Sequence, residues 1–139
     1  MARAKCIECA LYKRDVSVFI GSYEEMVAWA KTEFTNPVYK DFLESMEESR
    51  AGGADFHYGQ GSCVVRIPSF PITPEEISYL EHELLHATFY VLDYSGVTFI
   101  PGNPNEAYTY LHEYLTLHSL TPEGYEEVPN SIELPVIPD

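Results

Sequence analysis

The chain is short of basic residues. Its 139 residues include 8 Lys and Arg against 22 Asp and Glu, which gives a formal net charge of -14. Such a charge repels phosphate backbones and anionic membrane surfaces, so nucleic acid and membranes are excluded as expected partners. Two explanations of the acidity stay open: it keeps the protein in solution, or it forms a surface that engages a basic protein partner.

Cysteine and long apolar runs are also scarce. The three cysteines, Cys6, Cys9 and Cys63, are odd in number and argue against a disulfide framework, so we expect thiols in a reducing, cytoplasmic compartment. Cys6 and Cys9 have C-x-x-C spacing, but in an extended segment they point to opposite faces, which disfavours a second metal site. Without an eighteen-residue apolar window or a secretory signal, neither a membrane span nor export is expected.

Short apolar, β-branched runs alternate with amphipathic segments, a pattern that predicts an α+β domain. Two hairpins should form a small antiparallel or mixed sheet packed on four helices. The expected strands are residues 6–12, 16–20, 54–58 and 62–67, and the expected helices are residues 23–34, 38–50, 74–94 and 105–119. Ser22 and Thr73, each with a glutamate three residues on, predict capping boxes at the start of two helices. We expect residues 1–120 to form one domain and residues 121–139 an extended, proline-rich acidic tail.

Residues 82–86 read His-Glu-Leu-Leu-His within the third expected helix. A helix advances about 100° per residue, so His82 and His86 lie on one face, one turn apart, and can reach one ion. Glu83 projects beside them, where it can hold a metal-bound water as a general base. This helix is apolar nearly all round, and we therefore expect it to be the buried, central helix of the domain.

Residues 105–107 read Asn-Glu-Ala and begin the last expected helix. Together with the His-Glu-x-x-His motif they resemble the gluzincins, the thermolysin-like branch of the zinc metallopeptidases. The resemblance implies that His82, His86 and Glu106 bind Zn2+ and that Glu83 serves as the base. The order of hairpins and helices also resembles that of small proteins encoded by phages and prophages.

The chain departs from the gluzincin pattern in two places. Gluzincins have an aspartate four residues after the ligand glutamate, where it holds a zinc-bound histidine. Tyr110 stands there in this chain, and by helical geometry Tyr110 or Glu113 could take over the role. Gluzincins also draw an oxyanion-stabilising residue from a further domain, and Tyr110 and Tyr114 are the nearest candidates for that function here.

Three protein ligands leave the fourth position of tetrahedral zinc for water, as in catalytic sites. We therefore expect a zinc-dependent hydrolase, in the first place a peptidase, whose peptide or protein substrate adds to an exposed edge strand at residues 62–67. Two alternatives stay open. One is a zinc-containing binding protein without turnover whose acidic surface engages a basic partner, and the other is a structural zinc that joins two helices. The oligomeric state is not determined by the sequence.

Overall fold

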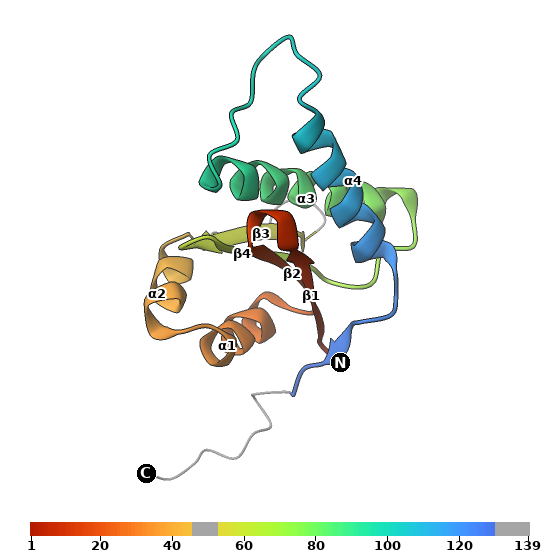
Figure 1. Ribbon diagram of the computed structural model, residues 1–139. Coiled ribbons are helices and arrows are strands. Elements are labelled where there is room, and N and C mark those ends of the chain that lie inside the picture. Colours follow the sequence, from red (N-terminus) through yellow and green to blue (C-terminus); the bar gives the residue numbers. More distant parts are fainter. Residues whose placement is uncertain (46–52, 130–139) are drawn as a thin grey trace.

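The structure is a computed structural model that describes residues 1–45 and 53–129, and it confirms the α+β class. Four helices pack on a five-stranded mixed sheet (Figure 1). In chain order the elements are β1 (Arg3–Cys9), the 3-10 turn η1 (Ala10–Tyr12), β2 (Arg14–Ile20), α1 (Tyr23–Glu33), α2 (Asn36–Ser45), β3 (Asp55–Gly59), β4 (Ser62–Ile67), α3 (Pro74–Tyr94), α4 (Glu106–Leu120) and β5 (Glu126–Glu127).

The sheet has the strand order β3-β4-β2-β1-β5. Each expected hairpin is antiparallel, and the two hairpins join through a parallel pairing of β2 with β4. This pairing corrects one expectation, because residues 62–67 are not an edge strand. They form β4, which is bonded to a neighbour on both sides, and the outer strand of that hairpin is β3. A strand paired on both sides has no free backbone groups to offer a peptide.

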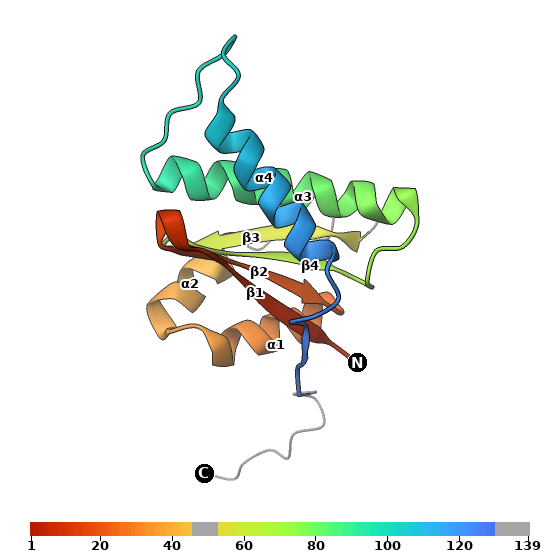
Figure 2. The ribbon, with the colours of Figure 1, turned by 45° about the vertical axis from the view of Figure 1, so that its right-hand side comes forward.

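Helices cover both faces of the sheet, with α3 and α4 on one face and α1 and α2 on the other (Figures 1 and 2). Side chains alternate along the strands between the two layers. Val16, Val18 and Val65 pack toward α3 and α4, whereas Phe19 and Val64 pack against α1 and α2. Two apolar layers therefore hold the sheet between the helix pairs.

The helix that carries the His-Glu-x-x-His motif begins where the sequence predicts. The Thr73 hydroxyl accepts a hydrogen bond from the Glu76 backbone N–H, and the Glu76 carboxylate accepts one from the backbone N–H of Thr73, which completes the capping box. The helix is not buried all round, however. It packs one side on the sheet and α4, and Leu85 and Phe89 are exposed on the other side. An apolar side chain on this helix is thus not evidence of burial.

The first part of the expected tail, residues 121–129, packs against the domain. Strand β5 pairs antiparallel with β1, and the Tyr125 hydroxyl donates a hydrogen bond to the Ser119 carbonyl. Residues 130–139 of that segment, like residues 46–50 of the expected second helix, lie outside the described residues. No helix in the described part of the chain is long and apolar enough to cross a membrane.

Candidate metal centre

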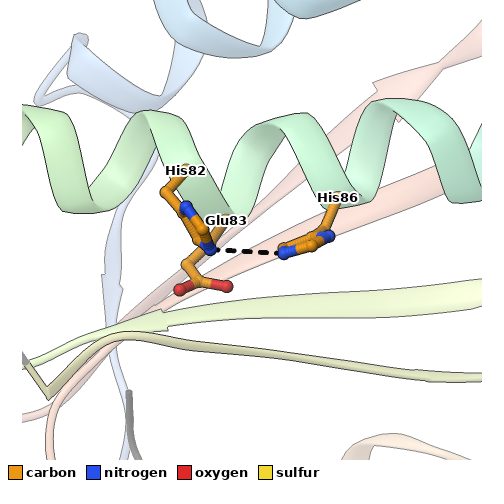
Figure 3. Close-up of side chains that lie close together, drawn as sticks. All are labelled: His82, Glu83 and His86. Carbon is orange, nitrogen blue, oxygen red and sulfur yellow. Dashed lines mark hydrogen bonds between the residues drawn. The ribbon is translucent and has the colours of Figure 1, made fainter. Parts of the chain in front are cut away.

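His82 and His86 project from the same side of α3, as their spacing predicts. Their Nε2 atoms lie 3.3 Å apart and both residues are exposed to solvent (Figure 3). A neutral imidazole has one ring nitrogen with a lone pair, so two rings that meet at this distance could bind one metal ion.

The separation of the two Nε2 atoms fits a tetrahedral metal ion. With zinc–nitrogen bonds of about 2.0–2.1 Å and a tetrahedral angle, two imidazole nitrogens on one ion are about 3.3–3.4 Å apart. The observed 3.3 Å agrees with this value. The same distance also accommodates a hydrogen bond from one protonated ring nitrogen to the other, so the two rings are arranged for either state.

Glu83 completes the group from the buried side of the helix. Its residue is only 3% exposed, and a carboxylate oxygen lies within 4.8 Å of a ring nitrogen of each histidine. Figure 3 shows the carboxylate below the two imidazoles, on the side of α3 that faces the sheet. A buried carboxylate is costly unless it is paired, and the two imidazole rings lie within reach of this one. His82, Glu83 and His86 could therefore hold a metal ion.

Aromatic side chains form one wall of this group. The Phe56 ring of β3 stacks on the His86 ring with centroids 5.8 Å apart, and Tyr90 meets Phe56 edge to face at 6.1 Å. Stacking restricts the rotation of the His86 ring and keeps water away from one of its faces. Strand β3 consequently lies directly beside the candidate metal centre.

The structure does not bring Glu106 to the group. This residue is exposed, and its carboxylate accepts a 3.4 Å hydrogen bond from the Thr109 hydroxyl within its own helix turn. Helix α4 meets α3 through Thr116, which donates a hydrogen bond to Glu81. Glu106 lies ten residues earlier, about 15 Å along the helix axis at 1.5 Å per residue. Glu81 itself lies about 100–140° around α3 from the two histidines.

The loop before α4 explains the position of Glu106. Asn105 has a left-handed backbone conformation, with φ of 52°, and its side-chain amide bonds both the N–H and the carbonyl of Ile100 and the carbonyl of Asn103. These bonds hold residues 100–105 as a compact turn that projects away from α3 (Figures 1 and 2). The sequence interval alone does not reveal the direction of that turn.

Tyr110 and Tyr114 also lie away from the group. The Tyr114 hydroxyl donates a 2.8 Å hydrogen bond to the Glu8 carbonyl at the end of β1, and Tyr110 is 65% exposed. Both line a cavity of about 380 Å³ between α4 and the turn η1, together with Leu11 and Tyr12. In this structure neither tyrosine is positioned to contact a substrate carbonyl at the histidines.

The two cysteines of β1 are weak acids in this structure. Cys6 is exposed and Cys9 is buried, as expected of residues that point to opposite faces of a strand. Burial and the nearby Asp15 carboxylate raise the pKa of Cys6 to about 11 and that of Cys9 to about 12. Thiolates are the reactive and metal-binding form, so both side chains are inert protonated thiols.

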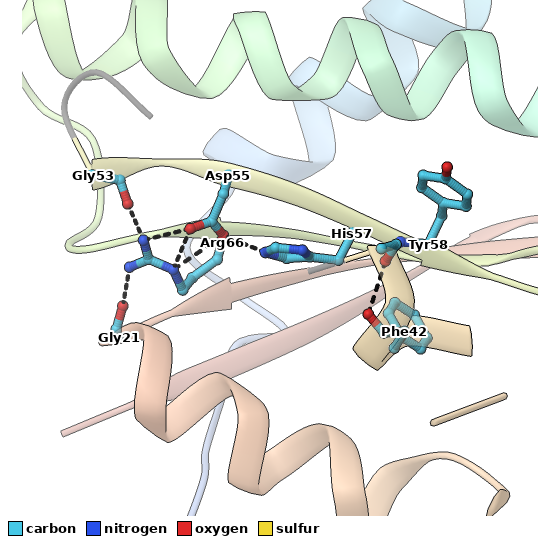
Figure 4. Close-up of polar contacts among 8 residues, drawn as sticks. Gly21, Phe42, Gly53, Asp55, His57, Tyr58 and Arg66 are labelled. Atoms are coloured by element: carbon cyan, nitrogen blue, oxygen red, sulfur yellow. Dashed lines mark hydrogen bonds and ion pairs between the residues drawn. The ribbon is translucent and has the colours of Figure 1, made fainter. Parts of the chain in front are cut away.

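A buried polar network on the face of β3 opposite the candidate centre was not predicted from the sequence. Asp55 of β3 accepts hydrogen bonds from the Arg66 guanidinium and from His57 Nε2, and Arg66 also donates to the carbonyls of Gly21 and Gly53 (Figure 4). Burial raises the pKa of Asp55, but the hydrogen bonds from His57 and Arg66 outweigh burial and hold that pKa below its usual value. The signal in the sequence was an acid and a histidine two residues apart in an apolar strand.

This network fixes the strand that flanks the histidines. Arg66 connects β4 to the start of β3 and to Gly21 at the end of β2, so one guanidinium joins three segments. Its side chain and that of Asp55 are almost wholly buried, which makes the contact rigid as well as charged. The position of Phe56 against His86 therefore depends on this ion pair.

Comparison of the chain with protein-family models, curated proteins and solved structures gives no match. The resemblance to gluzincins therefore rests on the residues of the two short motifs alone. The structure directly supports a group of His82, Glu83 and His86 that has the spacing of a metal site. The group lies on α3, a helix that packs on one face of the sheet (Figure 1).

Proposed function

We propose that this protein is a zinc-dependent hydrolase and that its substrate is a peptide. The observation that carries the proposal is the 3.3 Å separation of the two histidine Nε2 atoms beside a 3% exposed carboxylate. Zinc bound by two or three side chains lowers the pKa of a coordinated water to about 7 and polarises a carbonyl.

The residues of this chain would contribute binding and proton transfer. His82 and His86 would hold the ion through Nε2. Glu83, with its carboxylate within 4.8 Å of both rings, would accept the proton of the attacking water and return it to the departing amine.

The third ligand is the open element of the proposal. Glu106 could serve only if the turn at residues 100–105 and the start of α4 moved toward the histidines, since its carboxylate now bonds to Thr109. Glu83 could instead bind the ion itself, and the site would then lack its base. These two arrangements predict different effects of Glu106→Gln on zinc affinity, with a large loss in the first and no change in the second.

A peptide would lie along the outer side of β3. The backbone N–H of Tyr58 points away from β4, because it donates a hydrogen bond to the Ser45 hydroxyl. Backbone groups of alternate residues in an antiparallel strand point to the same side, so those of Phe56 also point outward. Phe56 is the residue that stacks on His86. A peptide that paired with Phe56 would thus present its carbonyl next to the histidines.

The test is a comparison of wild type with Glu83→Gln, which keeps the shape of the side chain and removes its basicity. We expect Glu83→Gln to retain stoichiometric zinc and to lose at least a hundredfold in the rate of peptide-library cleavage. Matched zinc content with unchanged cleavage would refute the role of Glu83. A variant without zinc would instead assign Glu83 as a ligand.

A second function is favoured by the net charge of -14 and by the separation of Glu106 from the histidines. In this alternative the protein binds zinc without turnover and uses its acidic surface to hold a basic partner protein. It predicts that wild type cleaves no peptide and that a partner recovered with wild type is also recovered with Glu83→Gln.

A further inference from the structure

A pocket at the end of β3 has the chemistry of a site for a cationic side chain. It has a volume of about 590 Å³ and lies between α2, the β3–β4 turn and the last turns of α3. We call it the tyrosine pocket, after the residues that give it its character: Tyr58, Tyr90 and Tyr94, with the carboxylates of Asp41 and Glu44 at its α2 side.

The three rings form a continuous aromatic wall. The centroids of Tyr58 and Tyr90 are 5.0 Å apart, and those of Tyr90 and Tyr94 are 5.8 Å apart. Tyr58 remains 47% exposed, so its ring is accessible to a ligand. The faces of tyrosine rings attract guanidinium and ammonium groups. The molecule itself shows this affinity, because the Arg14 guanidinium carbon lies 4.6 Å from the Tyr94 ring centroid.

Asp41 and Glu44 supply negative charge at the α2 side of the pocket. Neither Asp41 nor Glu44 forms an ion pair with another residue in the described part of the chain. Asp41 packs close to the backbone at Gly59, where a Cβ atom would come within 2.9 Å of the Asp41 Cβ. This tight contact fixes α2 against the end of β3 and keeps the acidic side of the pocket opposite the rings.

The pocket is continuous with the candidate metal centre through the aromatic wall. The Phe56 ring stacks on His86, and the Tyr58 ring stacks on Phe56 at 5.9 Å. From Phe56 to Gly59 is three residues of extended chain, about 10 Å. A peptide paired with Phe56 would therefore have the tyrosine pocket within reach of a long side chain two or three residues away from the carbonyl at the histidines.

We propose that the tyrosine pocket binds a lysine or arginine side chain of the peptide and makes this protein selective for basic substrates. The role of the pocket in substrate selection rests on the proposed hydrolase function, whereas the binding of the cationic side chain does not. The excess of acid over base in the whole chain would add to the selection by attracting basic polypeptides over longer distances.

The test measures peptide binding to zinc-loaded, full-length Glu83→Gln by fluorescence anisotropy. The peptides are otherwise neutral and carry arginine, lysine or norleucine at one position, which is moved along the peptide. We expect the arginine and lysine peptides to bind about tenfold more tightly than the norleucine peptide at one position, the product of a cation–π contact and a partly screened ion pair, each worth a few-fold.

Two sets of variants locate the effect. Asp41→Asn with Glu44→Gln, and separately Tyr58→Leu, should remove most of the preference for a basic side chain. The matched control is Glu24→Gln with Glu33→Gln, which removes two exposed carboxylates of α1 and should leave the preference intact. Circular dichroism of each variant checks that the fold is retained.

Equal binding of the arginine and norleucine peptides would overturn the inference, as would an equal loss of preference in the pocket and control double variants. The same measurements test the proposed hydrolase function independently of the pocket. A chain that prefers basic peptides and cleaves none refutes the hydrolase and supports the pocket, whereas cleavage with no basic preference refutes only the pocket.

Discussion

Asp55→Asn is the substitution that should most affect the strand beside the candidate metal centre. It keeps the size of the side chain but removes the negative charge of Asp55 from the Arg66 guanidinium, and both side chains are at most 4% exposed. Removal of one member of a buried ion pair costs about 3–5 kcal/mol, because the remaining charge stays buried and uncompensated. For a domain of this size the melting temperature should fall by roughly 10–20 °C.

The loss of stability in Asp55→Asn should depend on pH. The folded pKa of Asp55 lies below the unfolded value, so the carboxylate contributes its full stabilisation above the unfolded pKa and loses it as pH falls through the folded pKa. The difference in free energy of unfolding between wild type and Asp55→Asn should thus be constant from pH 5 to 7 and should shrink below about pH 4.

Urea unfolding at several pH values, followed by circular dichroism, measures this difference directly. Glu113→Gln is the control, since it removes an exposed carboxylate of α4 and should change stability by less than about 0.5 kcal/mol. A loss of under about 1 kcal/mol in Asp55→Asn, or a loss that does not change between pH 7 and pH 2, would refute the assignment of this ion pair as the fastening of β3.

Two further predictions concern the metal helix and the thiols. Thr73→Ala removes the hydroxyl that accepts the Glu76 N–H and should destabilise the protein by about 1 kcal/mol in urea unfolding; an unchanged midpoint would mean that the cap is dispensable. Cys6 should be alkylated by iodoacetamide at a rate that still rises tenfold per pH unit above pH 9, because its pKa is raised to about 11, and mass spectrometry would locate the label; a plateau near pH 9 would contradict that pKa.

Local signals in the sequence predicted the helices and hairpins well. The capping boxes at Ser22 and Thr73 place the starts of α1 and α3 to the residue. The second hairpin turns at Gln60 and Gly61, both with positive φ, within the expected glycine-rich turn. Such features involve residues close in the chain, so their physics is contained in a short stretch of sequence.

Long-range arrangements were less accessible. The parallel pairing of β2 with β4 joins residues about 47 positions apart, as in Val18 with Val65, and no local pattern indicates it. This pairing decides that β3 and not β4 is the outer strand of the hairpin. The burial of α3 was overestimated for a related reason: Leu85 and Phe89 are apolar yet exposed, since apolar atoms also make up much of a protein's surface.

In the candidate site, too, the residues close in the sequence were predicted correctly and the distant one was not. His82, Glu83 and His86 lie within one helical turn, so their grouping follows from helix geometry, and the structure brings them together. The predicted position of Glu106 depended instead on the path of the loop between two helices. Hydrogen bonds of the Asn105 side chain direct that loop away from α3, which the Asn-Glu-Ala sequence does not reveal by itself.

The central claim is that His82 and His86 bind one zinc ion. Elemental analysis of the purified full-length chain after dialysis against zinc tests it, with His86→Ala as the variant and His118→Ala, a histidine of α4, as the matched control. We predict about one zinc per chain in wild type and in His118→Ala, and none in His86→Ala. Zinc-free wild type, or equal zinc content in the two histidine variants, would contradict the claim.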